Sequence, residues 1–134
     1  MRHIEDSLQM AVIRIWRNLF SEYGDKLGID DLEDWEMLLH HSPNGGKRNT
    51  REAMRFKALG VRAGFPDLFL CIGNRDYRGL FIELKALSGT QSKPQKRFQK
   101  LAILMGYRYE VVRDLEICRN LFIEHLESYG TIKD

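Results

Sequence analysis

A glutamate and a lysine stand two residues apart inside an otherwise apolar run, and this placement most constrains how the chain can fold. Glu83 and Lys85 belong to the run 80–86, which Gly79 precedes and Gly89 follows. The run is β-prone, and on a strand the side chains at i and i+2 point to the same face. Burying two charges costs free energy unless they are paired or bind a metal. The run therefore predicts either a metal-binding site or a surface ion pair on a half-exposed strand.

A second carboxylate stands upstream at Asp67, directly after Pro66. The segment 65–72 predicts another strand, and the turn residues after it predict a hairpin with the apolar run. Antiparallel pairing then brings Asp67 close to Glu83. Two carboxylates beside a cation are the groups that a hydrolytic Mg²⁺ site needs, and the carbonyl of Leu84 could add a neutral ligand.

The rest of the chain predicts helices that pack against these strands. The predicted helices span 4–23, 50–59, 92–105 and 114–128, with a short one within 25–36, and the predicted strands span 37–41, 65–72, 80–86 and 107–113. The helices are predicted from apolar residues that recur at steps of three and four and from the capping residues Asn49, Ser92 and Asp114. Gly24 is predicted to end the first helix. This order predicts one α/β domain over residues 1–134.

Charge is distributed unevenly, although the net charge is only +2. Residues 1–44 carry four Lys or Arg and nine Asp or Glu, whereas residues 45–62 carry six basic residues and one acid. Residues 85–100 carry five basic residues and no acid. Basic windows on both sides of the carboxylates predict a polyanionic substrate whose phosphates contact Lys and Arg. The alternative is a pair of solvated helix faces.

Other features narrow the class of protein. No apolar stretch approaches the roughly 20 residues that a membrane span needs, and acids near the N-terminus argue against a signal peptide. Cys71 and Cys118 lie in apolar patterns, which predicts small buried side chains in a reducing, cytoplasmic compartment. The four histidines are not spaced like metal ligands, and His40 with His41 predict a strand end near the site.

Several ordered motifs resemble those of the VRR-NUC (virus-type replication-repair nuclease) family of the PD-(D/E)xK nuclease superfamily. They are Glu5 with Leu8-Gln9, the loop Pro43-Asn44-Gly45-Gly46, and the segments 60–68, 81–86 and 92–95. The resemblance runs from about residue 5 to residue 113. It implies a restriction-endonuclease-like core, with a mixed central sheet flanked by helices, and the hydrolysis of nucleic-acid phosphodiesters.

The resemblance also implies roles for individual residues. Glu5, Asp67, Glu83 and the Leu84 carbonyl would bind Mg²⁺ or Mn²⁺, and Asp67, Glu83, Lys85 and Gln95 would act at the scissile phosphate. For Gln95 a helix capping box is an equally strong interpretation, and for Glu5 the alternative is a first-turn glutamate favoured by the helix dipole. The candidates for DNA contact are Asn44, Lys47, Arg48, Arg62 and Lys93. Tyr107 and Tyr109 are predicted to pack the sheet.

These inferences converge on a metal-dependent, structure-selective endodeoxyribonuclease of a stand-alone bacterial or phage type. The first and last helices hold more apolar residues than one side of a sheet easily covers, which predicts a homodimer, the alternative being that all of them belong to the intramolecular core. Two symmetric sites suit two equivalent strands, and hence a four-way (Holliday) junction. The alternatives are a flap or fork nuclease, a less selective nickase, a DNA-binding module without catalysis, and an unrelated α/β domain with accidental motifs.

Overall fold

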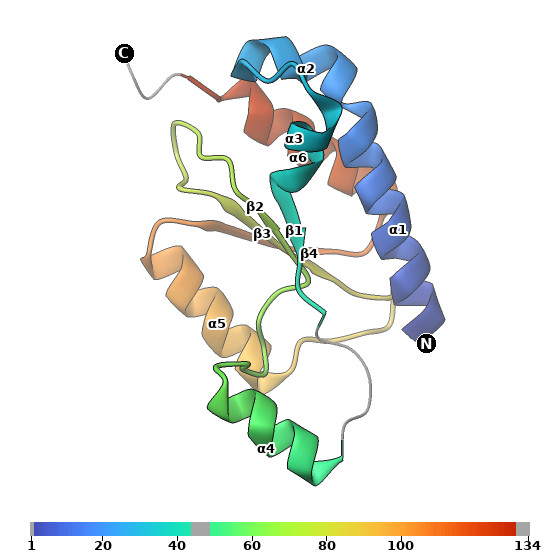
Figure 1. Ribbon diagram of the computed structural model, residues 1–134, viewed down its shortest axis with the longest axis vertical. Coiled ribbons are helices and arrows are strands. Elements are labelled where there is room, and N and C mark those ends of the chain that lie inside the picture. Colours follow the sequence, from blue (N-terminus) through green and yellow to red (C-terminus); the bar gives the residue numbers. More distant parts are fainter. Residues whose placement is uncertain (1, 44–48, 131–134) are drawn as a thin grey trace.

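The computed structural model describes residues 2–43 and 49–130, with the side chains of residues 2–5 outside that description. A four-stranded sheet lies between two layers of helix (Figure 1). The strands, in their order across the sheet, are β1 (Leu39–His41), β2 (Leu68–Leu70), β3 (Leu80–Leu84) and β4 (Arg108–Val112). The first two pairings are antiparallel and the pairing of β3 with β4 is parallel, so the sheet is mixed, as the resemblance implies.

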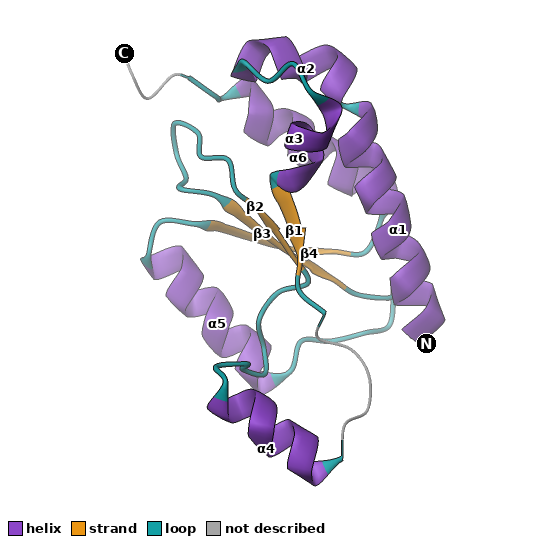
Figure 2. Cartoon of the chain, in the orientation of Figure 1, coloured by secondary structure: helices purple, strands orange, loops and turns teal. Residues whose placement is uncertain are grey.

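Helices lie on both faces of the sheet (Figure 2). The described helices are α1 (Arg2–Asn18), α2 (Phe20–Leu27), α3 (Leu32–Met37), α4 (Thr50–Ala58), α5 (Lys93–Leu104) and α6 (Leu115–Glu127), of which α4 lies away from the strands, next to α5. The capping predictions are confirmed, because the side chains of Asn49, Ser92 and Asp114 each accept a backbone N–H at the start of α4, α5 and α6. Within the described part of the chain, no helix is both long and apolar enough to cross a membrane.

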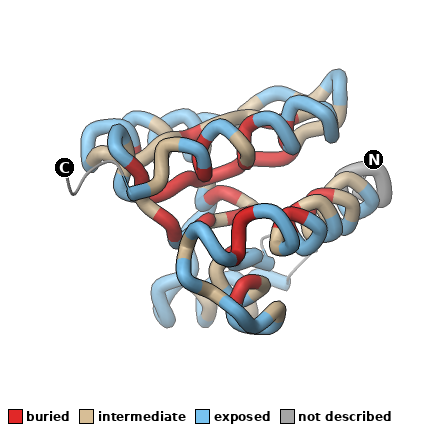
Figure 3. The backbone as a smooth tube through the Cα atoms, turned by 90° about the horizontal axis from the view of Figure 1, so that it is seen from above, coloured by how far each residue is buried: buried red, intermediate tan, exposed pale blue. Residues whose placement is uncertain are grey.

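The larger core lies on the face that α1, α3 and α6 cover, where buried residues gather on the inner sides of the elements (Figure 3). Its centre is the pair Trp16 and Trp35, whose rings stack with centroids 4.2 Å apart and an interplanar angle of 5°. Each indole N–H donates to the other residue's carbonyl, at 2.9 and 2.8 Å. The pair therefore fixes α3 against α1 without leaving a buried donor unsatisfied.

A smaller aromatic core lies on the opposite face, beneath α5. It is built from Phe81, Tyr109 and Ala102, with Phe69 and Phe98 packed against them. Successive residues of β3 alternate between the two cores, as the period of a strand requires. Glu83 therefore faces away from Ile82 and Leu84, toward the side of the aromatic core.

The predicted end of the first helix was wrong. The helix breaks at Leu19, and α2 then continues through Gly24 to Leu27. A Cβ on Gly24 would lie 2.8 Å from the carbonyl oxygen of Ile29, so this glycine is required by close packing rather than by a helix end. The cap is Gly28, whose φ of 77° is left-handed.

The apolar residues that predict a dimer interface belong mostly to the core. Trp16, Leu121, Phe122 and Leu126 are buried, and Ile13 and Phe20 pack against the same cluster. Of the residues behind that prediction, Leu115 and Ile117 are exposed, at 39% and 61%. The apolar residues of these two helices therefore do not by themselves support self-association, and the homodimer stays a prediction.

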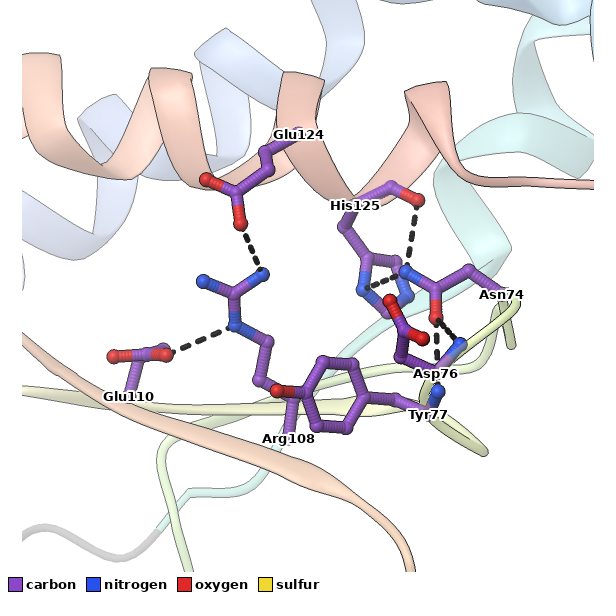
Figure 4. Close-up of polar contacts among 7 residues, drawn as sticks. All are labelled: Asn74, Asp76, Tyr77, Arg108, Glu110, Glu124 and His125. Atoms are coloured by element: carbon purple, nitrogen blue, oxygen red, sulfur yellow. Dashed lines mark hydrogen bonds and ion pairs between the residues drawn. The ribbon is translucent and has the colours of Figure 1, made fainter.

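A buried polar cluster ties the turn after β2 to α6 (Figure 4). His125 is fully buried, and its Nε2 lies 2.6 Å from the carbonyl oxygen of Ile72. A carbonyl only accepts, so Nε2 carries the proton and Nδ1 accepts from Asn74 Nδ2 at 3.1 Å. Asn74 Oδ1 in turn accepts the backbone N–H groups of Asp76 and Tyr77, each at 2.9 Å. These hydrogen bonds require a neutral imidazole, because only the neutral ring leaves Nδ1 free to accept.

We expect this cluster to weaken the fold at acidic pH. Burial lowers the pKa of His125 below its ordinary value, with Arg108 acting in the same direction, against the Ile72 carbonyl and Glu124. Near pH 6 the unfolded chain therefore binds more protons than the folded one. The free energy of unfolding should fall by up to about 1.4 kcal/mol per pH unit below roughly pH 6.5 and be unaffected by this group above it.

Urea unfolding of the wild type and His125→Gln between pH 5 and pH 8 measures this effect. The variant should be less stable at pH 8 and lose less stability on acidification. His40→Gln, which changes an exposed histidine of β1, is the matched control and should retain the wild-type slope. If the free energy of unfolding of His125→Gln falls with pH as steeply as that of the wild type, the assignment of this effect to His125 is wrong.

Candidate active site

Asp67 binds the end of β3 through its side chain. Its Oδ2 accepts a hydrogen bond from the backbone N–H of Leu84 at 2.7 Å. In a longer ladder Leu84 would pair with Pro66, which has no N–H to return, so β2 is shorter than the predicted strand 65–72. The carbonyl of Asp67 accepts from the N–H of Ser42 at 2.8 Å, which anchors it to the end of β1. The predicted approach of Asp67 to the Glu83–Lys85 segment is confirmed.

Glu83 is a buried carboxylate, with 3% of its surface exposed. Its Oε2 accepts from Gln95 Nε2 at 3.1 Å, and the Tyr109 hydroxyl lies 3.5 Å from Oε1. Burial first, and then the negative charge of Glu83, raise the pKa of Tyr109 to about 12. The phenol therefore keeps its proton and donates toward the carboxylate. Tyr109 packs the sheet, as predicted, but its contact with Glu83 was missed.

Gln95 holds the start of α5 and Glu83 with opposite ends of one amide. Its Oε1 accepts the N–H of Ser92 at 2.8 Å, while Ser92 Oγ accepts the N–H of Gln95 at 3.2 Å, which completes the capping box. Its Nε2 is then the donor that faces Glu83. The capping-box interpretation of Gln95 is therefore confirmed, and the same amide also contacts Glu83, whereas its action at the scissile phosphate stays a prediction.

Lys85 follows directly on β3 and is half-buried. Its N–H donates to the carbonyl of Val112 at 3.0 Å, which continues the parallel pairing by one residue. Arg113 Nη1 donates to the carbonyls of Ala86 and Gly89, at 2.8 and 2.5 Å, and so holds the turn that follows. Sequence reasoning missed Arg113, since its partners are backbone carbonyls and no motif marks it.

An open cleft of about 1030 Å³ lies between α4 and α5. Asp67, Glu83 and Gln95 line it with the basic residues Lys57, Arg62, Lys93 and Arg97 and with an apolar wall that includes Phe56, Val61, Phe65, Phe98 and Leu101. The structure thus brings the predicted Arg62 and Lys93 to the cleft that holds the carboxylates. Lys57 and Arg97 join them from the same basic windows.

Gly64 lets the loop before Asp67 pass close to α5. Its φ is 93°, and a Cβ there would lie 2.5 Å from the backbone carbon of Pro94. Any side chain would push the loop away from the first turn of the helix. The glycine therefore sets the position from which Phe65 and Asp67 reach the cleft.

The remaining predicted residues fall outside what the structure describes. Glu5 lies in α1, but its side chain is beyond the described ones, and Asn44, Lys47 and Arg48 are outside the described residues altogether. His41 lies at the site, as predicted, with Nδ1 3.2 Å from the carbonyl oxygen of Asp67.

The donor set fits a hard divalent cation. Among the side chains that the structure describes, those of residues 6–43 and 49–130, no group of three or more His, Cys, Asp or Glu is placed to hold a metal. The available donors are the carboxylates of Asp67 and Glu83 and the carbonyl of Leu84. The N–H and C=O of one strand residue face the same side, so the Leu84 carbonyl lies on the side on which its N–H donates to Asp67. Mg²⁺ is commonly bound by one or two carboxylates while keeping several waters, and Mn²⁺ suits the same oxygen donors.

A mixed sheet with helices on both faces, an aspartate beside a glutamate from the neighbouring strand, and a lysine two residues later define a nuclease-type domain of the PD-(D/E)xK class. The chain belongs to the VRR-NUC domain family, which it matches over residues 5–114. A solved structure described as a VRR_NUC domain protein aligns with a TM-score of 0.74 at 26% identity, covering 93% of this chain and 89% of that one. No curated protein matches the sequence. The family implies a nuclease-type, DNA-processing function.

Proposed function

We propose that this protein is a metal-dependent endodeoxyribonuclease that hydrolyses phosphodiesters of branched DNA. One observation carries the proposal: the 2.7 Å hydrogen bond from Leu84 to Asp67, which sets Asp67 beside the buried Glu83 in a cleft lined by basic side chains. Two carboxylates alone would repel a phosphate. A divalent cation bound between the carboxylates and the phosphate would remove this repulsion and make the site suitable for phosphate chemistry.

Asp67, Glu83 and the Leu84 carbonyl would hold Mg²⁺ or Mn²⁺, with Glu5 as a further proposed ligand. The bound ion would supply Lewis-acid polarisation of the scissile phosphate and a more acidic water. Lys85 would orient that water or stabilise the charge that develops on the phosphate.

Two further groups act through Glu83. Gln95 and Tyr109 donate toward separate oxygens of its carboxylate and so fix its orientation. Because Gln95 belongs to the first turn of α5, that helix and the carboxylate are positioned together.

The basic side chains of the cleft would bind the DNA backbone, together with Asn44, Lys47 and Arg48 as further proposed contacts. We expect the double variant Arg62→Ala with Lys93→Ala to weaken binding to every form of DNA. The slope of log affinity against log salt should flatten by up to about 0.9 for each lost duplex phosphate contact. Fluorescence anisotropy over a salt series, without divalent ions, measures both quantities.

Arg75→Ala is the matched control. Arg75 lies in the turn after β2, its side chain is 62% exposed, and it forms a surface ion pair with Asp76, with 3.8 Å between Nε and Oδ1. Its affinity and slope should equal those of the wild type. If the double variant also behaves like the wild type, the DNA lies elsewhere.

For the substrate we propose a four-way junction cut by a homodimer, since a two-fold pair of sites matches two equivalent strands. Self-association is supported by an exposed apolar group at the end of α5, where Ile103, Leu104 and Met105 are 57%, 72% and 56% exposed. Light scattering would give the mass, and a cruciform plasmid would report paired nicks. A cytoplasmic location is part of the proposal.

The second candidate is a flap or fork nuclease, which the open, partly apolar cleft favours because such substrates offer an unpaired strand. One assay separates the candidates: labelled duplex, flap, fork and four-way junction of matched sequence, with Mg²⁺, Mn²⁺ or EDTA. Preferential cleavage of the junction by a dimer supports the first. A monomer that prefers flaps supports the second, and equal cutting of all forms indicates a nonselective nickase. Binding without cleavage under any metal would leave only a DNA-binding module.

A further inference from the structure

We propose that the cleft beside the carboxylates holds an unpaired nucleobase, stacked on Phe65, one or two nucleotides from the scissile phosphate. This inference rests on the nuclease function proposed above. It specifies which part of a branched substrate the site takes, because a fully paired strand keeps its bases inside the duplex.

The composition of the cleft wall is the first argument. Contact with a duplex backbone needs only positive charge and polar groups, and four basic side chains of the cleft supply them. The same cleft also exposes an apolar wall, in which Phe65, Val61 and Leu101 are 37%, 42% and 50% exposed. A nucleobase is a ligand that covers an apolar surface while carrying phosphates on either side.

Phe65 is a rigid platform. Its ring centroid lies 4.9 Å from that of Phe98 and 5.6 Å from that of Phe81, with the second contact edge-to-face at 88°. Gly64 next to it is held against Pro94 by the close approach described above. A ring fixed on these sides offers its exposed part with little further loss of freedom, which favours stacking.

The position of Phe65 along the chain sets the place of the base. Phe65 precedes Asp67 by two residues, so their Cα atoms are at most about 7 Å apart. A strand of DNA advances roughly 3.4 Å per nucleotide in the duplex, so a base on Phe65 belongs to a nucleotide one or two steps from the phosphate at Asp67. Arg62 and Lys93 line the same cleft and would meet the flanking phosphates.

A binding experiment in EDTA tests the base subsite without cleavage. Three duplexes are compared: fully paired, with one unpaired nucleotide, and with the same nucleotide made abasic. We expect the wild type to bind the unpaired nucleotide about tenfold more tightly than the abasic one, as for stacking of one base on one aromatic ring. Phe65→Leu should abolish this preference and Phe65→Tyr should retain it.

The three duplexes and the variants form a double-mutant cycle, in which removing the ring and removing the base should not add. Affinity for the fully paired duplex should be the same in all variants, which controls for folding. An unchanged preference in Phe65→Leu would overturn the proposal, and so would an equal loss of affinity for all three duplexes. A change in mass by light scattering without a change in base preference would instead assign the wall to a second copy of this chain.

The outcome is distinguishable from failure of the nuclease proposal. A base preference that depends on Phe65, in a protein that cuts no DNA with Mg²⁺ or Mn²⁺, supports the subsite and refutes the nuclease. Cleavage of branched DNA without a base preference does the reverse.

Discussion

Asp67→Asn and Glu83→Gln should each reduce metal-dependent DNA cleavage by at least about 10³-fold, the equivalent of roughly 4 kcal/mol of transition-state stabilisation. Each change removes one charge from the proposed ligand set and keeps the shape of the side chain. The new amide oxygens can still accept from Leu84 and Gln95, so the fold should be retained. Binding to DNA without metal should persist or tighten, because a negative charge that faces phosphate is lost.

Cleavage is measured on a labelled branched substrate with Mg²⁺ and Mn²⁺, and binding by anisotropy in EDTA. Asp76→Asn is the matched control, since Asp76 is an exposed carboxylate in the turn after β2 and lies outside the cleft. It should cut like the wild type. Wild-type cleavage by both Asp67→Asn and Glu83→Gln would falsify the site.

Lys85→Ala should lower the cleavage rate by about 10²- to 10³-fold, the usual effect of removing one group that stabilises charge in the transition state. Affinity for Mn²⁺ should change little, because an ammonium is not a metal ligand. Single-turnover kinetics give the first quantity and calorimetry the second. Lys96→Ala, on the exposed surface of α5, is the matched control.

Two results would overturn this role of Lys85. One is a collapse of Mn²⁺ binding in Lys85→Ala together with cleavage restored by excess metal, which would make the lysine a support for the ligands. The other is a wild-type rate, which would leave the proposed chemistry to other groups.

Local signals predicted much of the fold. A capping residue binds N–H groups two or three positions away, so Asn49, Ser92 and Asp114 mark helix starts in any fold that contains those helices. The alternation of β3 needs only the period of a strand. The nearness of Asp67 to Glu83 needs one hairpin, and the family motifs indicate the same pair.

Contacts between distant segments could not be predicted in this way. Gly24 has the composition of a helix stop, but the carbonyl of Ile29, against which it packs, becomes visible only in the fold. Tyr109 reaches Glu83 across a parallel pairing whose register no local signal specifies. Arg113 holds the turn after Lys85 by donating to backbone carbonyls. Every residue has a backbone carbonyl, so no side-chain pattern in the sequence indicates this contact.

The apolar count behind the dimer prediction misleads for a related reason, and the homodimer itself stays a prediction. A count of apolar residues in two helices does not show how much of each is covered by the other and by α3. Here α1, α3 and α6 share one core. Self-association must be argued from what stays exposed.

The stacked indoles give the protein an internal optical reporter. The chain has two tryptophans, and both lie in the pair on the sheet face away from the cleft. Intrinsic tryptophan fluorescence and near-ultraviolet circular dichroism therefore sense the helical layer and not the region where DNA would bind. A cleft variant with an unchanged tryptophan spectrum has kept its main core, so its loss of activity can be attributed to the cleft.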